Sequence, residues 1–331
     1  MPECAELIKS IQQKLPQVFF TEQTVLITAS SGTGLWEAAV RNTINRKALN
    51  CVNGAFSDRF RQVTELNGKA NDVLEVPWGQ PVLPEQVAER LASGEYDAVT
   101  LVHNETSTGV TSPVKEIAEA VRSAPNGDEI MILVDSVSGL SGARIEVDAW
   151  DLDVVLASSQ KAFALPPGLA FCAVSNRAMS KAETVPYRGY YFDFLTLAKS
   201  MAKFQTPATP AVSLLYALDL QLDRMMAEGM ENRFRRHLDM RDRTLQWARD
   251  AGFSLYAAPG YESPTVTCIN NDLGLDIADL NTYLRSEGMY ISNGYGKLKG
   301  THFRLAHMGD VTMVELEELF AVMDAYLAAH A

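Results

Sequence analysis

Residues 24–44 read TVLITASSGTGLWEAAVRNTI, which is an apolar run, a short glycine-containing turn and a helical pattern in direct succession. The same order recurs further on, since DVLEV (72–76) precedes PEQVAERLAS (84–93) and DAVTLV (97–102) precedes PVKEIAEAVR (113–122). More apolar runs follow: IMILV (130–134), DVVLA (153–157) and LAFCAV (169–174). Continuous Val, Ile and Leu runs that alternate with helices are typical of a mostly parallel sheet covered by helices. We therefore predict an α/β fold, with ligands bound at the carboxyl ends of the strands.

The pattern changes after about residue 210 to long helical segments, followed by TVTCI (265–269), IADLNTYLRSEG (277–288) and HFRLA (302–306). The inner faces of the first and last long helices are predicted to carry Phe234, Leu238, Leu245 and Ala248, and Leu316, Phe320, Met323 and Leu327. We predict a large domain over residues 1–228 and a smaller C-terminal α+β domain over residues 229–331.

Charge and cysteine content narrow the class of protein. The 331 residues include 29 basic and 41 acidic side chains, a net charge of −12, which disfavours nucleic acid as a partner. The four cysteines lie far apart without a CxxC pair, so neither a metal site nor a disulfide framework is indicated. Membrane spans need about 20 apolar residues, and no stretch has that length. We expect a cytoplasmic protein that acts on small molecules, without metal and without membrane attachment.

Ser31, Gly32 and Thr33 lie where TVLIT leads into the first helix of the sheet region. Glycines allow a tight turn, and a helix start offers unpaired N–H groups at the positive end of its dipole, so this turn can bind a phosphate. A dinucleotide site would need a glycine at Glu37 and an acidic residue at Asn53, which disfavours NAD. A serine cap with glycines for the turn explains the motif equally well.

Two charged residues follow later apolar runs. Asp135 ends IMILV, where a carboxylate needs a cationic partner such as a protonated pyridine nitrogen, unless it only caps the next turn. Lys161 follows DVVLA, among small and apolar neighbours that can lower its pKa by desolvation. Only a neutral amine condenses with an aldehyde to a Schiff base. The alternative for Lys161 is an ordinary exposed lysine.

A phosphate cradle, a strand-end carboxylate and a loop lysine correspond, in this order, to three parts of one cofactor. With them, the chain resembles the class V aminotransferase family of fold-type-I pyridoxal 5′-phosphate (PLP) enzymes, which includes alanine–glyoxylate, serine–glyoxylate and phosphoserine aminotransferases. The resemblance extends from about residue 28 to residue 309, in the phrases SSGTGLWEAA, NGAFSDRF, HNETSTGV, LVDSVSGL, SSQKAFALPPG, QTPATP and HFRLAHMG. It implies the PLP-transferase fold type I.

The resemblance assigns a role to each matching residue. Lys161 matches the lysine that holds PLP as a Schiff base, and Asp135 matches the carboxylate at the pyridine nitrogen. Phe56 matches the aromatic that stacks on the ring, although core burial alone would explain it. Arg304 matches the arginine that binds the substrate α-carboxylate through two parallel hydrogen bonds, rather than a surface strand arginine. The matching phosphate positions are Ser31, Gly32, Thr33 and Gln160.

Two further matches concern the cofactor's other neighbours. Thr106 matches the polar residue near the phenolic oxygen of PLP. Gln205, Thr206 and Thr209 match a loop that reaches the phosphate in the neighbouring subunit, which implies a homodimer with shared active sites. Family members usually begin with a PGP-like phrase and a His-Arg pair, whereas this chain opens at Met1 with a helical pattern. We hypothesise a truncated or divergent start.

The activity that the resemblance implies is a ping-pong transfer of an amino group between a small amino acid, such as alanine or serine, and a 2-oxo acid such as glyoxylate. One alternative is phosphoserine aminotransferase, coupled to glutamate and 2-oxoglutarate. Extra cations for it could come from Lys297, Lys299, His302 and His307, although a solvated basic turn explains these four residues equally well. Another is a catalytically impaired PLP-binding protein, if the N-terminal arm is truly absent. A cysteine desulfurase is disfavoured because Cys172 and Cys268 fall in apolar runs and should be inert. A plain nucleotide-binding domain is the remaining alternative.

Overall fold

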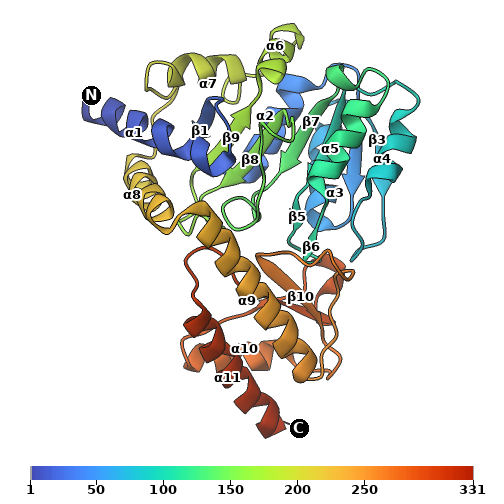
Figure 1. Cartoon of the computed structure of the whole chain (residues 1–331), viewed down its shortest axis with the longest axis vertical. Helices are drawn as coiled ribbons and strands as arrows, with labels where there is room; N and C mark the ends of the chain where they lie inside the picture. Colours follow the sequence, from blue (N-terminus) through green and yellow to red (C-terminus); the bar gives the residue numbers. More distant parts are fainter. Residues whose placement is uncertain (1, 331) are drawn as a thin grey trace.

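The computed structural model describes residues 2–330 and has a broad upper lobe and a narrower lower lobe (Figure 1). A seven-stranded sheet in the order β1-β9-β8-β7-β4-β2-β3 forms the centre of the upper lobe. Its strands are β1 (Val25–Thr28), β2 (Lys47–Val52), β3 (Ala70–Glu75), β4 (Ala98–Val102), β7 (Met131–Asp135), β8 (Val154–Ser158) and β9 (Ala170–Val174). All of these strands run in one direction except β9, which is antiparallel to both of its neighbours, β1 and β8. The predicted mostly parallel sheet is confirmed.

Helices pack around this sheet because their apolar faces and the Val/Ile/Leu strands exclude water together. They are α1 (Pro2–Phe19), α2 (Gly32–Thr43), α3 (Ala55–Leu66), α4 (Pro84–Leu91), α5 (Val114–Ser123), α6 (Asn176–Thr184), α7 (Phe194–Met201) and α8 (Val212–Glu228). Helix α2 lies against β7, β8 and β9, and α3 lies against β2, β3 and β4. A short hairpin of β5 (Asn104–Glu105) and β6 (Val110–Thr111) and a 3₁₀ turn, η1 (Gly127–Glu129), complete the upper lobe.

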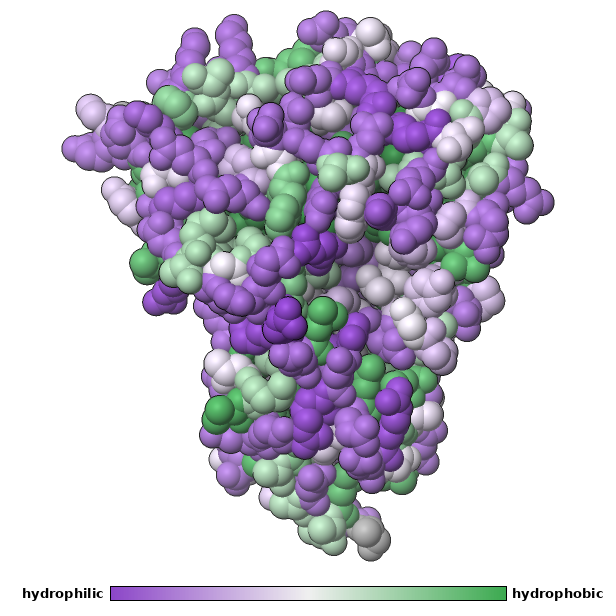
Figure 2. Space-filling view, viewed as in Figure 1, coloured by the Kyte–Doolittle hydropathy of each residue, from purple (hydrophilic) through white to green (hydrophobic). Residues whose placement is uncertain are grey.

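The lower lobe has its own core, built on an antiparallel sheet in the order β10-β12-β11. Its elements are α9 (Met230–Asp250), β10 (Val266–Asn270), α10 (Ile277–Ser286), β11 (Ser292–Asn293), η2 (Gly296–Leu298), β12 (His302–Ala306) and α11 (Met313–His330). The rings of Trp247 and Phe320 stack at its centre, with centroids 4.7 Å apart. Figure 2 shows that the visible surface of both lobes is largely hydrophilic, with small apolar areas between charged side chains.

Helix α9 joins the two lobes. Gly229 has a φ of 79°, which interrupts the helical pattern between α8 and α9. Met230, at the start of α9, packs on the upper core, whereas Met240 belongs to the lower one. The boundary between residues 228 and 229 therefore stays a prediction. One expected core position is wrong: Leu238 is 38% exposed, because this turn of α9 borders an open groove that it shares with Phe234, Thr111 and His103.

Within residues 2–330 there is no helix whose length and apolar character would let it cross a bilayer.

Candidate active site

The carboxyl ends of parallel strands bring the chemically important residues to one edge of the sheet. Strands β1, β7 and β8 run in the same direction, so the segments that follow them meet there. Ser31 follows β1 at the start of α2, Asp135 is the last residue of β7, and Lys161 lies in the turn after β8. The structure thus brings together three residues that are up to 130 positions apart in the sequence, from Ser31 to Lys161.

Asp135 is buried, with 4% of its surface exposed. Its Oδ2 accepts a hydrogen bond from Trp36 Nε1 at 2.9 Å, and its Oδ1 accepts one from the Val137 N–H at 2.7 Å. Burial raises the pKa of Asp135 to about 7, and the two hydrogen bonds and the charge of Lys161 offset only part of that rise. A carboxylate in this position would be stabilised by a cation, as the sequence predicted.

Lys161 is half-buried in a tight turn that is closed by a 2.8 Å hydrogen bond from the Ala164 N–H to the Lys161 carbonyl. Burial lowers the pKa of its amine, and the charge of Arg304 lowers this pKa further, while Asp135 opposes both effects. The alternative of an ordinary exposed lysine is therefore wrong. Gln160, one residue before it, is exposed.

The start of α2 offers backbone donors. Ser31 is the N-cap residue, but its hydroxyl accepts no capping bond from any part of the chain that the structure describes, so the serine-cap alternative is wrong. Gly32 is buried, and a Cβ at this position would overlap the side chain of Val137, which follows Asp135 by two residues. Thr33, in contrast, is exposed. The first turn of α2 thus packs against the Asp135 segment; the Gly34 N–H donates to the Ser31 carbonyl at 3.0 Å, while the Ser31 hydroxyl accepts from none of the first-turn N–H groups.

Arg304 lies on the central strand of the lower sheet and reaches the upper lobe. Its Nη1 donates to the Thr106 carbonyl at 3.0 Å and its Nε donates to the Asn293 carbonyl at 3.2 Å. Its guanidinium lies 5.4 Å from the centre of the Tyr295 ring, and burial lowers its pKa. Arg304 is therefore not a surface strand arginine, because it joins the two lobes beside the site.

Phe56 and Thr106 border the same region from the upper lobe. The ring of Phe56 is half-buried and lies 4.9 Å from the Tyr295 ring, centre to centre, at an angle of 34°. The Thr106 hydroxyl donates to the Ser138 hydroxyl at 2.8 Å. The Arg59 guanidinium also lies over this ring, 5.3 Å from its centre. Phe56 is neither fully buried in the core nor isolated at the surface, and its stacking on a cofactor stays a prediction.

The loop with the other three predicted residues lies next to the end of β1. Gln205 and Thr209 are exposed, and the Thr206 hydroxyl donates to the Ala208 carbonyl at 2.7 Å. Thr206 and Thr209 line a small pocket together with Thr28, the last residue of β1. The role of this loop at a partner subunit stays a prediction.

Two important residues at this edge were missed from the sequence. Trp36 lies within the helical pattern after the glycine turn, and its sequence gives no sign that its indole N–H reaches Asp135. Glu105 is fully buried, and the N–H groups of Phe56 and Ser57 donate to it, the latter at 2.8 Å. The signal for Glu105 was the same as that for Asp135, an acidic residue just after an apolar strand.

The structure also places the residues on which the two alternative activities, phosphoserine aminotransferase and cysteine desulfurase, would depend. His307 is fully buried, its Nε2 lies 2.9 Å from the Thr267 hydroxyl, and burial lowers its pKa to about 3, so it is wrong as an extra cation. The Lys297 amine lies 4.1 Å from the centre of the Trp78 ring. Burial raises the pKa of the Cys172 thiol, and raises that of Cys268 to about 12, which disfavours the reactive thiolate form at both positions.

Together, an uncapped helix start, a buried carboxylate with a raised pKa and a half-buried lysine with a lowered pKa, all at one sheet edge, fit a PLP-dependent enzyme of fold type I. Two hydroxyls at strand ends beside this edge, Thr28 Oγ1 and Ser158 Oγ, are buried and have no hydrogen-bond partner among residues 2–330. Such groups are rare in proteins and suit a site that a polar ligand completes.

The chain belongs to the class V aminotransferase family, whose members are PLP-dependent transaminases. The family model described as "Aminotransferase class-V" matches residues 63–308. An uncharacterized aminotransferase of Methanocaldococcus jannaschii is 36% identical over 92% of this chain and 80% of its own length. A serine–glyoxylate aminotransferase of Methylorubrum extorquens is 34% identical, over 97% of this chain and 82% of its own. The structure of an alanine–glyoxylate aminotransferase from Nostoc sp. matches with a TM-score of 0.91 and 28% identity, over 99% of this chain and 88% of that one. The fold-type-I prediction and the family resemblance are confirmed.

Proposed function

We propose that this protein is an aminotransferase that moves an amino group from a small amino acid, of the alanine or serine type, to a 2-oxo acid such as glyoxylate. The observation that carries the proposal is the half-buried Lys161, whose pKa is lowered, at the same sheet edge as the buried Asp135. The similarity to the alanine–glyoxylate and serine–glyoxylate enzymes supports glyoxylate as the acceptor. The donor follows only from these relatives.

PLP is the cofactor that the site would hold. When bound, it supplies an electron-withdrawing ring that accepts the electrons of a broken Cα–H bond. The first-turn N–H groups of α2, with Ser31 and Thr33, would hold the phosphate, and Gln160 would support it from the lysine turn. Asp135 would hold the proton on the ring nitrogen, and the positive charge there would in turn stabilise the buried carboxylate. Phe56 would fix the plane of the ring by stacking.

Lys161 would act twice through its Nζ atom. A lowered pKa keeps more of its amine neutral, which is the form that attaches covalently to an aldehyde. When its Nζ is not attached to the cofactor, the same neutral amine would take the substrate Cα proton as a general base. Arg304 would hold the α-carboxylate with the N–H groups that do not bond to the Asn293 and Thr106 carbonyls, so that the Cα–H bond faces Lys161.

We further propose a homodimer in which Gln205, Thr206 and Thr209 approach the partner's cofactor phosphate. Support comes from exposed apolar side chains near this loop, which a second subunit would cover. Val212, Tyr216 and Leu220 are 37%, 56% and 56% exposed and form one stripe along α8, just after the loop. Tyr191, whose hydroxyl donates to the Ala29 carbonyl at 3.3 Å, borders the same region. A reducing cytoplasmic location also stays a proposal.

The test of the function uses the purified protein with PLP. We expect a yellow absorption band that borohydride fixes to the chain at Lys161, and that alanine, serine or aspartate bleaches at different rates while glyoxylate restores it. Lys161→Ala should lose the fixed band, whereas the exposed Lys115→Ala should keep it. Covalent fixation that survives in Lys161→Ala would refute the assignment. A band that no amino donor bleaches would identify a protein that binds the cofactor without turnover.

A further inference from the structure

One backbone carbonyl in the lysine turn is held from two directions. The Ala162 carbonyl, one residue after Lys161, accepts a 2.8 Å hydrogen bond from the Ser141 hydroxyl and another of 2.8 Å from Arg233 Nη2. Ser141 is buried on the segment that follows Asp135, and it adopts a left-handed φ of 73° that is unfavourable for a serine. The Lys161 turn is thus tied both to the Asp135 segment and to α9.

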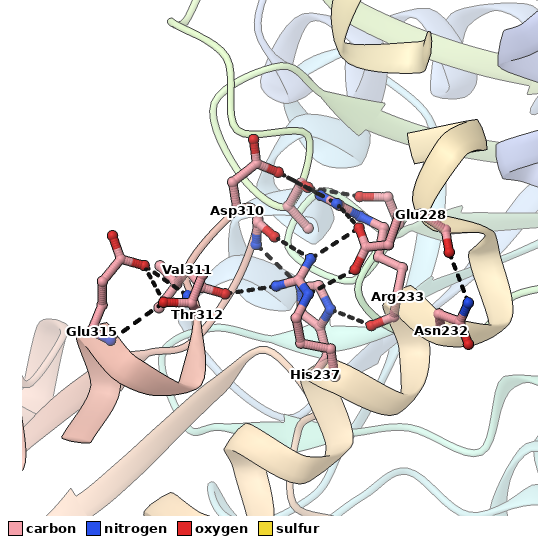
Figure 3. A network of polar contacts seen from close by, with 12 residues as sticks. Glu228, Asn232, Arg233, His237, Asp310, Val311, Thr312 and Glu315 are labelled. Carbon is pink, nitrogen blue, oxygen red and sulfur yellow. Dashed lines mark hydrogen bonds and ion pairs between the residues drawn. The ribbon is translucent and has the colours of Figure 1, made fainter. Parts of the chain in front are cut away.

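Arg233 is the unusual member of this arrangement, because its guanidinium is buried with only 1% of the residue exposed. Two carboxylates compensate its charge: Glu228 Oε2 lies 2.7 Å from Nη1, and Asp310 Oδ1 lies 3.3 Å from both Nη1 and Nη2 (Figure 3). Gln221 Nε2 donates to both oxygens of Asp310 at 2.9 Å. A buried cation is retained only where its partners are well placed, so the position of Arg233 depends on the end of α8 and on the segment after β12.

The segment after β12 touches the lysine turn a second time, at Gly309. The Gly309 N–H donates to His237 Nε2 at 3.1 Å, and His237 Nδ1 lies 2.7 Å from the Arg233 carbonyl, so the ring bridges the two. Burial lowers the pKa of His237 to about 4, which keeps it neutral and able to accept this bond. A Cβ on Gly309 would lie 3.1 Å from Ala164 Cβ and 3.4 Å from the Lys161 carbonyl oxygen, so its backbone packs directly on the turn.

We infer that Arg233 is a positioning residue for Lys161: its hydrogen bond to the Ala162 carbonyl fixes the turn that presents the lysine to the cofactor. Because its carboxylate partners lie at the α8–α9 junction and on the lower lobe, Arg233 also links the lysine turn to the lobe that carries Arg304. This inference rests on the proposed function and adds to it a residue that does not itself contact the reacting atoms.

Arg236 provides a matched control for the test. It pairs with the same Glu228 at 2.7 Å and donates to the Val311 and Gly309 carbonyls at 2.6 and 3.1 Å, but none of these three bonds ends on the turn from Lys161 to Ala164. Arg233→Lys and Arg236→Lys therefore disturb the same junction, and only the first removes the bond to Ala162. Arg233→Lys should lose more thermal stability, because 2% of the Arg233 side chain is exposed against 24% of Arg236, so the comparison uses PLP binding by the folded proteins.

The deciding measurements are the dissociation constant of PLP and the pH at which half of the yellow band has disappeared. For Arg233→Lys we expect PLP to bind roughly 5–10-fold more weakly, as the loss of one charge-assisted hydrogen bond implies, and the half-disappearance pH to move. Arg236→Lys should leave the pH unchanged and the binding within about twofold. Equal behaviour of the two variants would overturn the inference.

Arg233→Lys could fail to fold, and Asp310→Asn then tests the same link. This variant keeps the buried guanidinium but weakens its anchor, and Asp310 is half-exposed, with 46% of its side chain accessible, so the fold should tolerate it. A smaller change of the half-disappearance pH in the same direction supports the inference, and no change contradicts it. Absence of any band in the unmodified protein would instead refute the proposed function, which keeps the two failures distinct.

Discussion

Two helices begin at the same edge of the same sheet, and their first turns are satisfied in opposite ways. At the start of α3, Glu105 accepts from the N–H groups of Phe56 and Ser57, and the Ser107 hydroxyl accepts from the Ala55 N–H at 3.0 Å. At the start of α2, the Ser31 hydroxyl caps nothing within the described chain. One helix start is thus neutralised by an internal carboxylate, and the other receives no capping bond from its N-cap side chain, so its dipole would favour an anion.

The buried acids beside these two helix starts, Glu105 and Asp135, also differ in how many donors surround them. Glu105 also accepts from the hydroxyls of Ser57 and Ser107, at 2.9 and 2.6 Å, so donors surround it. Within residues 2–330, Asp135 accepts only from Trp36 and Val137, and burial raises its pKa to about 7. The α2 side therefore has a helix start without a side-chain cap and a buried acid with a raised pKa. A ligand with a phosphate at one end and a protonated ring nitrogen at the other would satisfy both, whereas the α3 side needs no ligand.

The largest effect should come from removing the carboxylate charge at the start of α3. Glu105→Gln replaces a carboxylate by an amide whose NH₂ faces backbone donors, so we expect the apoprotein to lose about 3–4 kcal/mol of unfolding free energy. Urea unfolding measures this loss. The exposed Glu116→Gln on α5 is the control and should change stability by less than about 0.5 kcal/mol. A loss below about 1 kcal/mol for Glu105→Gln would mean that the α3 start does not depend on this carboxylate.

The second effect concerns Asp135, the buried acid beside the start of α2. Because burial raises the pKa of Asp135 above its unfolded value, the folded apoprotein binds this proton more tightly, and its contribution to stability declines as the pH rises towards and through about 7. Between pH 5 and pH 8 the apoprotein should lose about 2–3 kcal/mol more than Asp135→Asn. Urea unfolding of both proteins at the two pH values gives this difference, and parallel pH profiles would contradict it.

The third effect is the stabilisation of the apoprotein by a simple anion, which should depend on the start of α2 and not on the start of α3. Inorganic phosphate at about ten times its dissociation constant should stabilise the apoprotein by about 1.4 kcal/mol, measured as a rise in melting temperature. Gly32→Ala pushes a methyl group against Val137 and should abolish the rise. Gly54→Ala crowds Glu105 and Ser107 at the α3 start, and should lower stability while leaving the phosphate effect intact. A phosphate effect that Gly54→Ala removes and Gly32→Ala retains would reverse the comparison.

The smallest effect tests the missing cap itself. Replacement of a capping side chain costs about 1 kcal/mol, but Ser31 makes no capping bond in the described structure, so Ser31→Ala should change apoprotein stability by less than about 0.5 kcal/mol. Asp276 caps α10 by accepting from the Ala278 and Asp279 N–H groups, so Asp276→Ala should cost the full amount, about 1 kcal/mol. Thermal unfolding measures both. A comparable loss for Ser31→Ala would show that Ser31 caps α2 after all.

Local patterns were sufficient for the elements and for the two central charged residues. Apolar runs that end in Asp135 or lead to Lys161 place a charged group at a strand end, and burial of the strand then shifts the pKa of that group by desolvation. The antiparallel direction of β9 was not predictable, because an apolar run reads the same in either direction. The prediction of Leu238 as a core residue was wrong because periodicity does not reveal which part of a helix face stays exposed. The prediction of His307 as a cation was wrong because local charge does not reveal that a histidine is buried.

By itself, the sequence determined the alternation of strands and helices, the family, and the order of glycine turn, carboxylate and lysine, since all of these depend on neighbours within a few positions along the chain. Only the tertiary structure decided which helix start remains available, through Glu105, and which donors hold Asp135 and the lysine turn, through Trp36, Ser141 and Arg233. The physical reason is that a buried charge is stabilised by groups close to it in space, and these come from distant parts of the chain.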